Sequence, residues 1–411
     1  MHTMANTPLP RLLTGAAQRV ARTMPVVVVT GARQTGKSTL VRDLLPGRRA
    51  YQTLDDLDVW AQAERTPDEL VERPGSLVLD EVQRVPDLLL AVKRAVDRDR
   101  RPGRYVLTGS ANLLLMRSVS ESLAGRAAYL TLWPMTRRER LGQGRAGLWS
   151  ELLDHPCEDW PEILAGSDPA PEDWRAVASG GGYPVPAVEY DDPADRAIWF
   201  DGFIRTYLER DLQDLSSIDS LVDFRRLMAA ACLRLGQLVN QTELGRDIQV
   251  PQPTVRRWLN LLEASYQLVP LPAYAANRTK RLIKTPKVYW SDTGLALRLA
   301  GLAAPGGAHL ENLVLSDLLA WRDASVLDRP ELFYWRTATG EEVDFVVERG
   351  SQLLGIEVKS TARPRPSDAK HLRTFREEYG DSVTGCLLLH AGEEIGWVGP
   401  RILAAPWWRV V

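Results

Sequence analysis

Residues 31–38 read Gly-Ala-Arg-Gln-Thr-Gly-Lys-Ser, and this run matches the phosphate-loop pattern G-x-x-x-x-G-K-[ST] at every specified position. An apolar run predicted to be a strand, Val26–Thr30, enters it, and Thr39–Leu45 leaves it as a predicted helix. Glycines let the backbone bend so that successive N–H groups point at phosphates, and the helix N-terminus adds positive potential. The sequence therefore predicts a nucleotide-binding loop made of Gly31, Ala32, Arg33, Gln34, Thr35, Gly36, Lys37, Ser38 and Thr39.

Two loop residues and one acidic pair are expected to handle the phosphates. Lys37 supplies a mobile charge to the β- and γ-phosphates, and Ser38 offers a hydroxyl to Mg²⁺, so ATP with Mg²⁺ is the expected ligand. The apolar run Leu77–Leu79 ends in Asp80 and Glu81, which a parallel sheet places at its ligand-binding carboxyl edge. There Asp80 is expected to hold Mg²⁺ and Glu81 to polarise the attacking water, which suits hydrolysis rather than phosphate transfer.

A third predicted strand, Tyr105–Thr108, runs into polar residues that include Ser110 and Asn112. If this strand lies between the other two, these side chains sense the γ-phosphate or position water. The alternative is that they cap the helix that follows. Arg126 is a candidate to reach the γ-phosphate, in cis or from a neighbouring subunit, and the alternative is an ordinary solvated arginine.

Composition bounds the class of protein. At 411 residues the chain is expected to hold two to four domains, and 45% hydrophobic with 25% charged residues is typical of soluble globular proteins. No apolar run approaches the ~20 residues that a membrane span needs, and no secretory signal is recognised, so a cytoplasmic protein without a membrane partner is expected. The three cysteines show no metal or disulfide spacing. A net charge of −2 argues against a DNA-coating role.

The pattern along the chain predicts an α/β protein with several units. Short β-branched runs alternate with helical stretches over residues 1–140, which predicts a parallel-sheet ATPase domain. Residues 141–225 are expected to form a lid or linker and a helical region, because glycine, proline, tryptophan and acid dominate their first part. Residues 226–290 are expected to form a winged-helix-like domain, and residues 291–411 an α/β domain of the nuclease-like class described below.

The middle of the chain has a helix–turn–helix pattern. Thr242–Ile248 and Pro253–Glu263 are predicted helices, followed by predicted strands at Tyr266–Pro270 and Lys287–Trp290. This resembles a winged helix, in which the second helix contacts the DNA major groove and basic wings contact phosphates. The stretch Arg278–Lys284 is the candidate basic wing, with Arg278, Lys280, Arg281 and Lys284. The alternative is a module for packing or protein contact, because Glu243, Asp247 and Glu263 lie in the same region.

The segment Glu341–Ser360 predicts a β-hairpin. Gly350-Ser351 is a two-residue turn signal, and it predicts that Arg349 faces Gln352 and, counting back, that Asp344 faces Glu357 and Glu342 faces Lys359. Two facing carboxylates repel each other, and a divalent cation between them would remove that cost. One predicted face is apolar: Val343, Phe345, Val347, Leu354, Ile356 and Val358. A solvated face with a Glu342–Lys359 ion pair explains the same residues.

Two family resemblances follow from these motifs. An Asp followed by Glu-x-Lys on the next strand looks like the PD-(D/E)xK nuclease site, which implies metal ligation by Asp344 and Glu357 and a positioning role for Lys359. Glu311, on the predicted helix His309–Trp321, matches the preceding acid of such sites. Nearly the whole chain resembles the AAA+-type ATPases of bacteria and archaea that carry a C-terminal domain of unknown function. That resemblance rests on residues 31–40, 79–83, 107–112, 181–184, 207–211 and 291–294. Val185 departs from it, because the family often has glutamate there.

These observations predict an ATP-hydrolysing switch or motor that is associated with DNA and carries a nuclease-like C-terminal domain. Closure around the γ-phosphate is expected to reposition the C-terminal half. The competing interpretation is a regulatory nucleotide-binding scaffold that contacts proteins and neither moves nor cuts DNA. The oligomeric state stays open.

Overall fold

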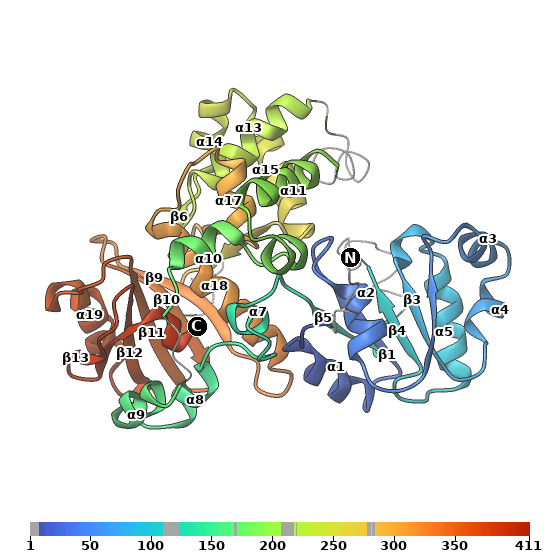
Figure 1. Cartoon of the computed structure of the whole chain (residues 1–411), viewed down its shortest axis with the longest axis horizontal. Helices are drawn as coiled ribbons and strands as arrows, with labels where there is room; N and C mark the ends of the chain where they lie inside the picture. Colours follow the sequence, from blue (N-terminus) through green and yellow to red (C-terminus); the bar gives the residue numbers. More distant parts are fainter. Residues whose placement is uncertain are drawn as a thin grey trace.

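The computed structural model describes residues 8–109, 123–167, 171–206, 218, 220–277, 281 and 284–411. Figure 1 shows an N-terminal α/β domain (blue), a helical middle domain (green to yellow) and a C-terminal sheet with its helices (red). Within the described ranges, no helix is long and apolar enough to cross a membrane. The three cysteines are free and buried, as their scattered spacing predicts.

The N-terminal domain has a five-stranded parallel sheet in the order β2-β3-β4-β1-β5. Four valines in succession, Val26–Val29, are fully buried because helices cover both faces, as is typical of parallel sheets. The sequence pattern predicts all five strands within one residue of their observed bounds, at Val26–Thr30, Ala50–Leu54, Ser76–Asp80, Tyr105–Thr108 and Ala128–Leu132. The strands are β1 (Val26–Thr30), β2 (Arg49–Thr53), β3 (Ser76–Asp80), β4 (Tyr105–Thr108) and β5 (Ala127–Thr131), and the helices are α1 (Leu13–Ala21), α2 (Lys37–Thr39), α3 (Leu57–Arg65), α4 (Pro67–Val71) and α5 (Leu88–Arg98).

Short helices after the first sheet connect to both other parts of the molecule. They are α7 (Arg137–Arg140), α8 (Trp149–Asp154), α9 (Trp160–Ala165) and α10 (Trp174–Gly180). A lid, an insertion or a linker was expected in residues 142–182, and α8 and α9 of this stretch pack against the C-terminal domain (Figure 1). The Trp160 ring fills the space above Gly385, where an added Cβ would lie 2.5 Å from it. The tryptophans in this stretch therefore serve packing.

The middle domain joins helices to a small antiparallel sheet in the order β6-β8-β7. Its helix–turn–helix, α14 (Gln241–Ile248) and α15 (Gln252–Ala264), is the one predicted from the sequence, and Val255, Leu259 and Leu262 of α15 are buried together as expected. The other elements are α11 (Pro193–Phe203), α13 (Leu221–Cys232), β6 (Gln237–Leu238), β7 (Leu268–Leu271), β8 (Lys287–Trp290) and α17 (Thr293–Leu299). Helix α17 packs on α10, α11 and α13 of the middle domain, although it follows residue 290 and was therefore predicted to belong to the C-terminal domain.

The C-terminal domain has a six-stranded mixed sheet in the order β13-β14-β12-β11-β10-β9. The β10–β11 hairpin has the predicted register, with Arg349 opposite Gln352 and Phe345 opposite Ile356. Gly350 at the turn has a φ of 61°, which glycine adopts without strain. The elements are α18 (Gly307–Ala324), β9 (Glu331–Arg336), β10 (Glu342–Arg349), β11 (Gln352–Lys359), α19 (Lys370–Tyr379), β12 (Val383–His390), β13 (Gly396–Gly399), β14 (Ile402–Pro406) and α20 (Trp407–Val410).

The prediction of one apolar and one charged hairpin face was wrong in part, because both faces of this sheet are buried. Phe345 packs on the α18 side, whereas Val346 and Leu353 pack on the α19 side with Phe375. Val343 also lies on the α19 side, because the pairing of β10 with β9 is irregular between Val343 and Val346. A strand with two buried faces lacks the alternation that marks a solvated face.

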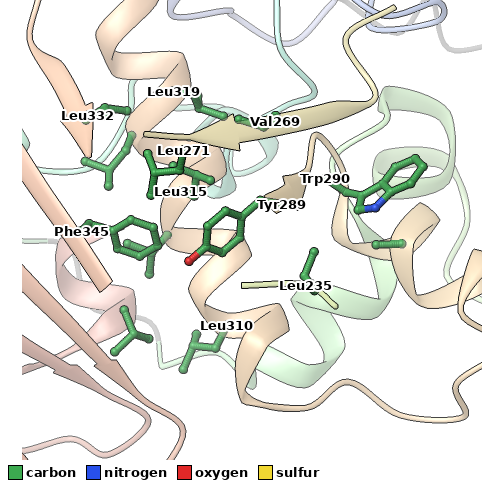
Figure 2. Close-up of a cluster of buried hydrophobic side chains, with 14 of the residues drawn as sticks. Leu235, Val269, Leu271, Tyr289, Trp290, Leu310, Leu315, Leu319, Leu332 and Phe345 are labelled. Carbon is green, nitrogen blue, oxygen red and sulfur yellow. The ribbon is translucent and has the colours of Figure 1, made fainter. Parts of the chain in front are cut away.

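The middle and C-terminal domains share one hydrophobic core. Figure 2 shows Tyr289 of β8 pointing between Phe345 of β10 and Leu310 of α18, and the Tyr289 and Phe345 ring centroids lie 5.8 Å apart. Leu271 of β7 packs in the same cluster. The two units are therefore joined as one packed body rather than linked by a mobile connector.

Candidate functional site

The phosphate loop depends on its two glycines. Gly31 has a φ of 143°, and a Cβ there would lie 2.2 Å from the carbonyl oxygen of Leu132. Gly36 has a φ of 93° and begins the short helix α2. A side chain at either position would be strained, so the two glycines of the motif are required by the backbone itself.

Lys37 is a buried cation whose contacts are backbone carbonyls of its own loop. Its Nζ donates to the carbonyl oxygens of Ala32 (2.8 Å) and Gly31 (3.3 Å). Burial lowers the pKa of Lys37 to about 8, and the negative charges of Glu81 and Asp80 offset only part of that effect. Among the described residues, no carboxylate lies within ion-pairing distance of Nζ. The loop therefore presents a buried positive charge that an anion would stabilise.

Asp80, at the end of β3, is hydrogen-bonded to β2, to β4 and to the phosphate loop. Its Oδ2 accepts hydrogen bonds from Ser38 Oγ (2.8 Å) and Tyr51 Oη (2.5 Å), and its Oδ1 accepts one from Thr108 Oγ1. Strand β4 lies between β1 and β3, the condition set for its role in the sequence analysis, and this order brings Thr108 next to Asp80. The predicted metal pair, Ser38 and Asp80, is brought together, and its hydroxyl and carboxylate oxygens are the donors that Mg²⁺ takes.

Glu81 has a left-handed backbone with a φ of 60°. Its N–H donates to Thr108 Oγ1 (3.3 Å), and its carboxylate accepts from Gln83 Nε2. A non-glycine residue in this conformation costs on the order of 1–3 kcal/mol and is found preferentially at functional sites. The strained turn lifts the Glu81 side chain away from the strand, where it remains partly exposed beside Asp80.

Arg126 does not lie near the loop. In the parallel register Val26 pairs with Ala127, so Arg126 is at the amino edge of the sheet, roughly 16 Å of strand away from the loop. Its Nε donates to Asp97 Oδ1 (2.6 Å) and its Nη1 to the Ala124 carbonyl (3.0 Å). The predicted γ-phosphate contact in cis was therefore wrong. Contact with a neighbouring subunit stays a prediction, and Ser110 and Asn112 lie outside the described residues.

Several residues at the site were missed from the sequence, and Arg11 is the clearest. It donates to the loop carbonyl of Thr35 (2.7 Å) and to the Trp133 carbonyl (2.7 Å), and it is paired with Glu139 at 3.2 Å. Arg11 precedes its loop partner Thr35 by 24 residues and forms no local motif, so no sequence signal marks it. Tyr51 and Thr108 were missed for the same reason, because only the sheet order brings them to Asp80.

A cavity of about 270 Å³ adjoins the phosphate loop. Arg11, Gly36 and Thr39 line one side. The opposite side comes from Pro184, Val188 and Glu189, in the segment that connects to the middle domain. Val185 begins the π-helical turn Val185–Glu189 on that side. The cavity therefore lies between two domains.

A second cluster gathers the carboxylates predicted in the C-terminal domain, but an internal lysine accompanies them. Lys287 of β8 lies 2.5 Å from Glu342 and 3.4 Å from Asp344, and its side chain is only 2% exposed. Lys359 pairs with Glu357 at 2.7 Å, so the Glu342–Lys359 pair considered from the sequence was wrong. The ammonium of Lys287 supplies the charge that the sequence interpretation had assigned to a divalent cation.

Proton affinities in this cluster reflect burial and crowding. Burial first, and the charge of Asp344 second, raise the pKa of Glu311 and of Glu357 to about 8. Glu311 accepts a hydrogen bond from Tyr289 Oη (3.3 Å), and Glu357 Oε2 is buried without a partner. Within the described part of the chain, no three His, Cys, Asp or Glu side chains are arranged to hold a metal ion. The three-carboxylate metal site predicted for Asp344, Glu357 and Glu311 is therefore not found among the described residues, and Lys287 lies 3.4 Å from Asp344 instead.

The structure does not place Arg281, one residue of the predicted basic wing, where DNA could contact it. Arg281 is 8% exposed, forms a two-bond ion pair with Glu348 and lies over the Tyr274 and Phe333 rings. Lys284 is exposed, 3.5 Å from the Arg336 carbonyl. Arg278 and Lys280 lie outside the described residues. Arg281 therefore fastens the middle domain to the C-terminal sheet instead of facing solvent.

Comparisons with known proteins divide the chain in the same places. Three family models match it: "AAA domain" over residues 23–141, "Domain of unknown function (DUF8612)" over 171–306 and "Domain of unknown function (DUF4143)" over 306–409. Among solved structures, the Walker-type ATPase of Pyrococcus abyssi is 16% identical with a TM-score of 0.42, covering 70% of this chain and 94% of that chain. A likeness of that size carries no argument about the site.

Curated relatives match over most of their length. "Uncharacterized protein Rv2008c" of Mycobacterium tuberculosis and "Uncharacterized protein Mb2031c" of Mycobacterium bovis are each 34% identical over 406 residues, covering 95% of this chain and 82% of the relative. A Haemophilus influenzae protein is 22% identical over 381 residues, covering 86% of this chain and 87% of that protein. The chain therefore belongs to the family of these mycobacterial proteins, and its AAA domain makes it an ATPase.

Proposed function

We propose that the protein is an ATP-driven switch that hydrolyses ATP with Mg²⁺ and contacts DNA through its middle domain. The proposal that the protein binds ATP rests on the buried charge of Lys37, whose hydrogen-bond partners within the described residues are two loop carbonyls. A triphosphate at the N-terminus of α2 would replace those carbonyls with charged oxygens. The adjoining cavity between Arg11, Thr39 and Pro184 then takes the base and ribose.

Ser38 and Asp80 are the residues that would hold Mg²⁺, and the ion would supply positive charge to the β- and γ-phosphates. Glu81 polarises the attacking water, because it follows Asp80 directly and its side chain is partly exposed. Thr108 helps to place both acids, since its hydroxyl donates to Asp80 and accepts from the Glu81 N–H.

The case for DNA rests on the topology of the middle domain. Its elements follow the order α13, β6, α14, α15, β7, β8, the sheet order is β6-β8-β7, and α15 packs against α14 and β7. Val255, Trp258 and Leu262 form its packed face, and Arg256, Arg257 and Asn260 are exposed on the other. This arrangement supports a winged helix whose second helix carries the residues that contact DNA.

The C-terminal domain supports a scaffold role more than a nuclease role. Glu311 on a helix, Asp344 on a strand and Glu-x-Lys on the next strand occur in the order that the resemblance implies. Lys287, however, is bound to Glu342 and Asp344. We therefore assign this domain a nuclease-like architecture without metal-dependent cleavage.

A second candidate function is a nucleotide-binding scaffold that contacts proteins. The buried ion pair of Arg281 with Glu348 favours this scaffold, because it uses a cation of the predicted wing that would otherwise be available to DNA phosphates. The net charge of −2 agrees with that choice.

The two candidates differ in one measurement, the rate of ATP hydrolysis with Mg²⁺ in the presence and absence of duplex and branched DNA. Lys37→Ala serves as the blank. We expect DNA to raise the rate several-fold and Arg256→Ala to abolish that increase while leaving the basal rate. A rate that is indifferent to DNA would exclude the DNA-switch proposal and favour the scaffold.

A further inference from the structure

Tyr266 is a strained residue that joins the middle domain to the phosphate loop. It follows α15 after Ser265, and its backbone φ of 60° is unusual for a side chain of this size. Its hydroxyl donates a 2.8 Å hydrogen bond to Thr30 Oγ1, although the two residues are 236 positions apart. A costly local conformation is thus held by a long-range contact.

Thr30 is the last residue of β1 and precedes the loop directly. Its own carbonyl accepts from the Leu132 N–H (2.8 Å), and the carbonyl of the next residue, Gly31, accepts from Lys37 Nζ (3.3 Å). The Tyr266 hydroxyl therefore contacts the point where the strand passes into the phosphate loop.

The Tyr266 ring reaches the loop by a second route. It packs edge-on against Trp133, with centroids 6.0 Å apart and planes at 85°. The Trp133 carbonyl accepts from Arg11 Nη2 (2.7 Å), and Arg11 Nη1 donates to the loop carbonyl of Thr35 (2.7 Å). The hydroxyl therefore contacts the start of the loop at Thr30, and the ring is connected through Trp133 and Arg11 to Thr35 near its end.

The middle-domain side of this contact is firmly anchored. Ser265 and Gln267, on either side of Tyr266, are buried, and the Gln267 N–H donates to the Leu262 carbonyl of α15 (2.8 Å). Burial raises the pKa of Tyr266, so its hydroxyl keeps the proton that it donates. A rotation of α15 would therefore be transmitted to Thr30 and Trp133.

We infer that Tyr266 is a positioning residue for ATP hydrolysis, through which α15 and the middle domain set the geometry of the phosphate loop. This role rests on the ATP hydrolysis of the proposed function, and it does not depend on the proposed contact with DNA. Tyr266 holds the loop through other residues and is not placed to contact the phosphates itself.

The test is a double-mutant cycle with Tyr266→Phe, which removes the hydroxyl and keeps the ring, and Thr30→Val, which removes the acceptor and keeps the branched shape. Each single variant should lower kcat about fivefold, the value of one neutral hydrogen bond, with the ATP Kd within twofold. The double variant should lose no more than either single one. Tyr379→Phe, the same change in α19 of the C-terminal domain, is the matched control and should leave kcat unchanged.

Two results would overturn the inference. One is a lower melting temperature with unchanged kcat in Tyr266→Phe, which would make the contact structural only. The other is a double variant about 25-fold slower, because independent losses multiply and would show that the two groups do not act together. The kcat of every variant is measured without DNA. A negative result for Tyr266 would therefore leave the proposed DNA contact untouched.

Discussion

Lys287 and Glu342 form an ion pair of 2.5 Å that joins the middle domain to the C-terminal sheet. Burial alone would lower the pKa of Lys287, but the charges of Asp344, Glu311 and Glu342 outweigh it and the pKa is raised. The lysine therefore remains charged across the physiological range. The pair connects the two domains, because the cation lies on the middle domain and the carboxylates lie on the C-terminal domain. We call this contact the inter-domain latch.

Lys287→Met should lower the free energy of unfolding by about 3 kcal/mol, because it leaves Glu342 and Asp344 without their buried cation. Urea denaturation measures the loss. The matched control is Lys370→Met, whose exposed ammonium lies 3.8 Å from Glu341 and whose removal should cost less than about 1 kcal/mol. An equal loss of unfolding free energy in the two variants would show that the inter-domain latch of Lys287 does not hold the two domains together.

The same cluster makes stability depend on pH. In the folded protein the pKa of Glu311 is raised to about 8, because burial and, next, the charge of Asp344 disfavour its anion. In the unfolded chain a glutamate has a pKa near ~4.3. The folded state thus binds more protons between these values, so its contribution to stability falls as pH rises from about 5 to about 8.

Glu311→Gln should remove that dependence. The difference in unfolding free energy between wild type and variant is expected to favour wild type more at pH 5 than at pH 8. Glu243→Gln, on the exposed side of α14, supplies the control. A difference that stays constant across this interval would contradict a protonated Glu311.

Glu81→Gln separates binding from hydrolysis. The amide keeps the size of the side chain but cannot accept a proton from water, so kcat should fall at least ~100-fold, in the range for lost general-base catalysis. The ATP Kd, measured by calorimetry, should stay within twofold. Glu69→Gln, exposed on α4, is the control, and Glu81 loses its assigned role if its amide variant retains turnover.

The sequence predicted the nucleotide site because the information there is local. Residues 31–38 dictate the loop, and apolar runs bounded by turn signals gave β1, β3 and β4 at their observed bounds. The hairpin register was equally predictable, since the Gly350–Ser351 turn fixes every pair that follows. The place of β4 between β1 and β3, which could be stated from the sequence only as a condition, is the one observed.

Long-range partners could not be predicted. Lys287 reaches Asp344 from another domain, Tyr266 reaches Thr30 across 236 positions, and Arg11 belongs to no motif. The error at Arg126 had a different cause. A residue that precedes a strand of a parallel sheet lies at the edge opposite the loops that follow the strands, and this rule alone would have excluded it in cis.

The central claim is that Lys37 and its loop bind ATP. The most direct test is isothermal titration of ATP with Mg²⁺ into wild type and Lys37→Ala, with Lys93→Ala on α5 as the control for a lost charge. We predict a single site per chain in wild type and in the control, and an affinity at least ~100-fold weaker in Lys37→Ala, since a charge-assisted contact with phosphate is lost. Unchanged affinity in Lys37→Ala would contradict the assignment of the site.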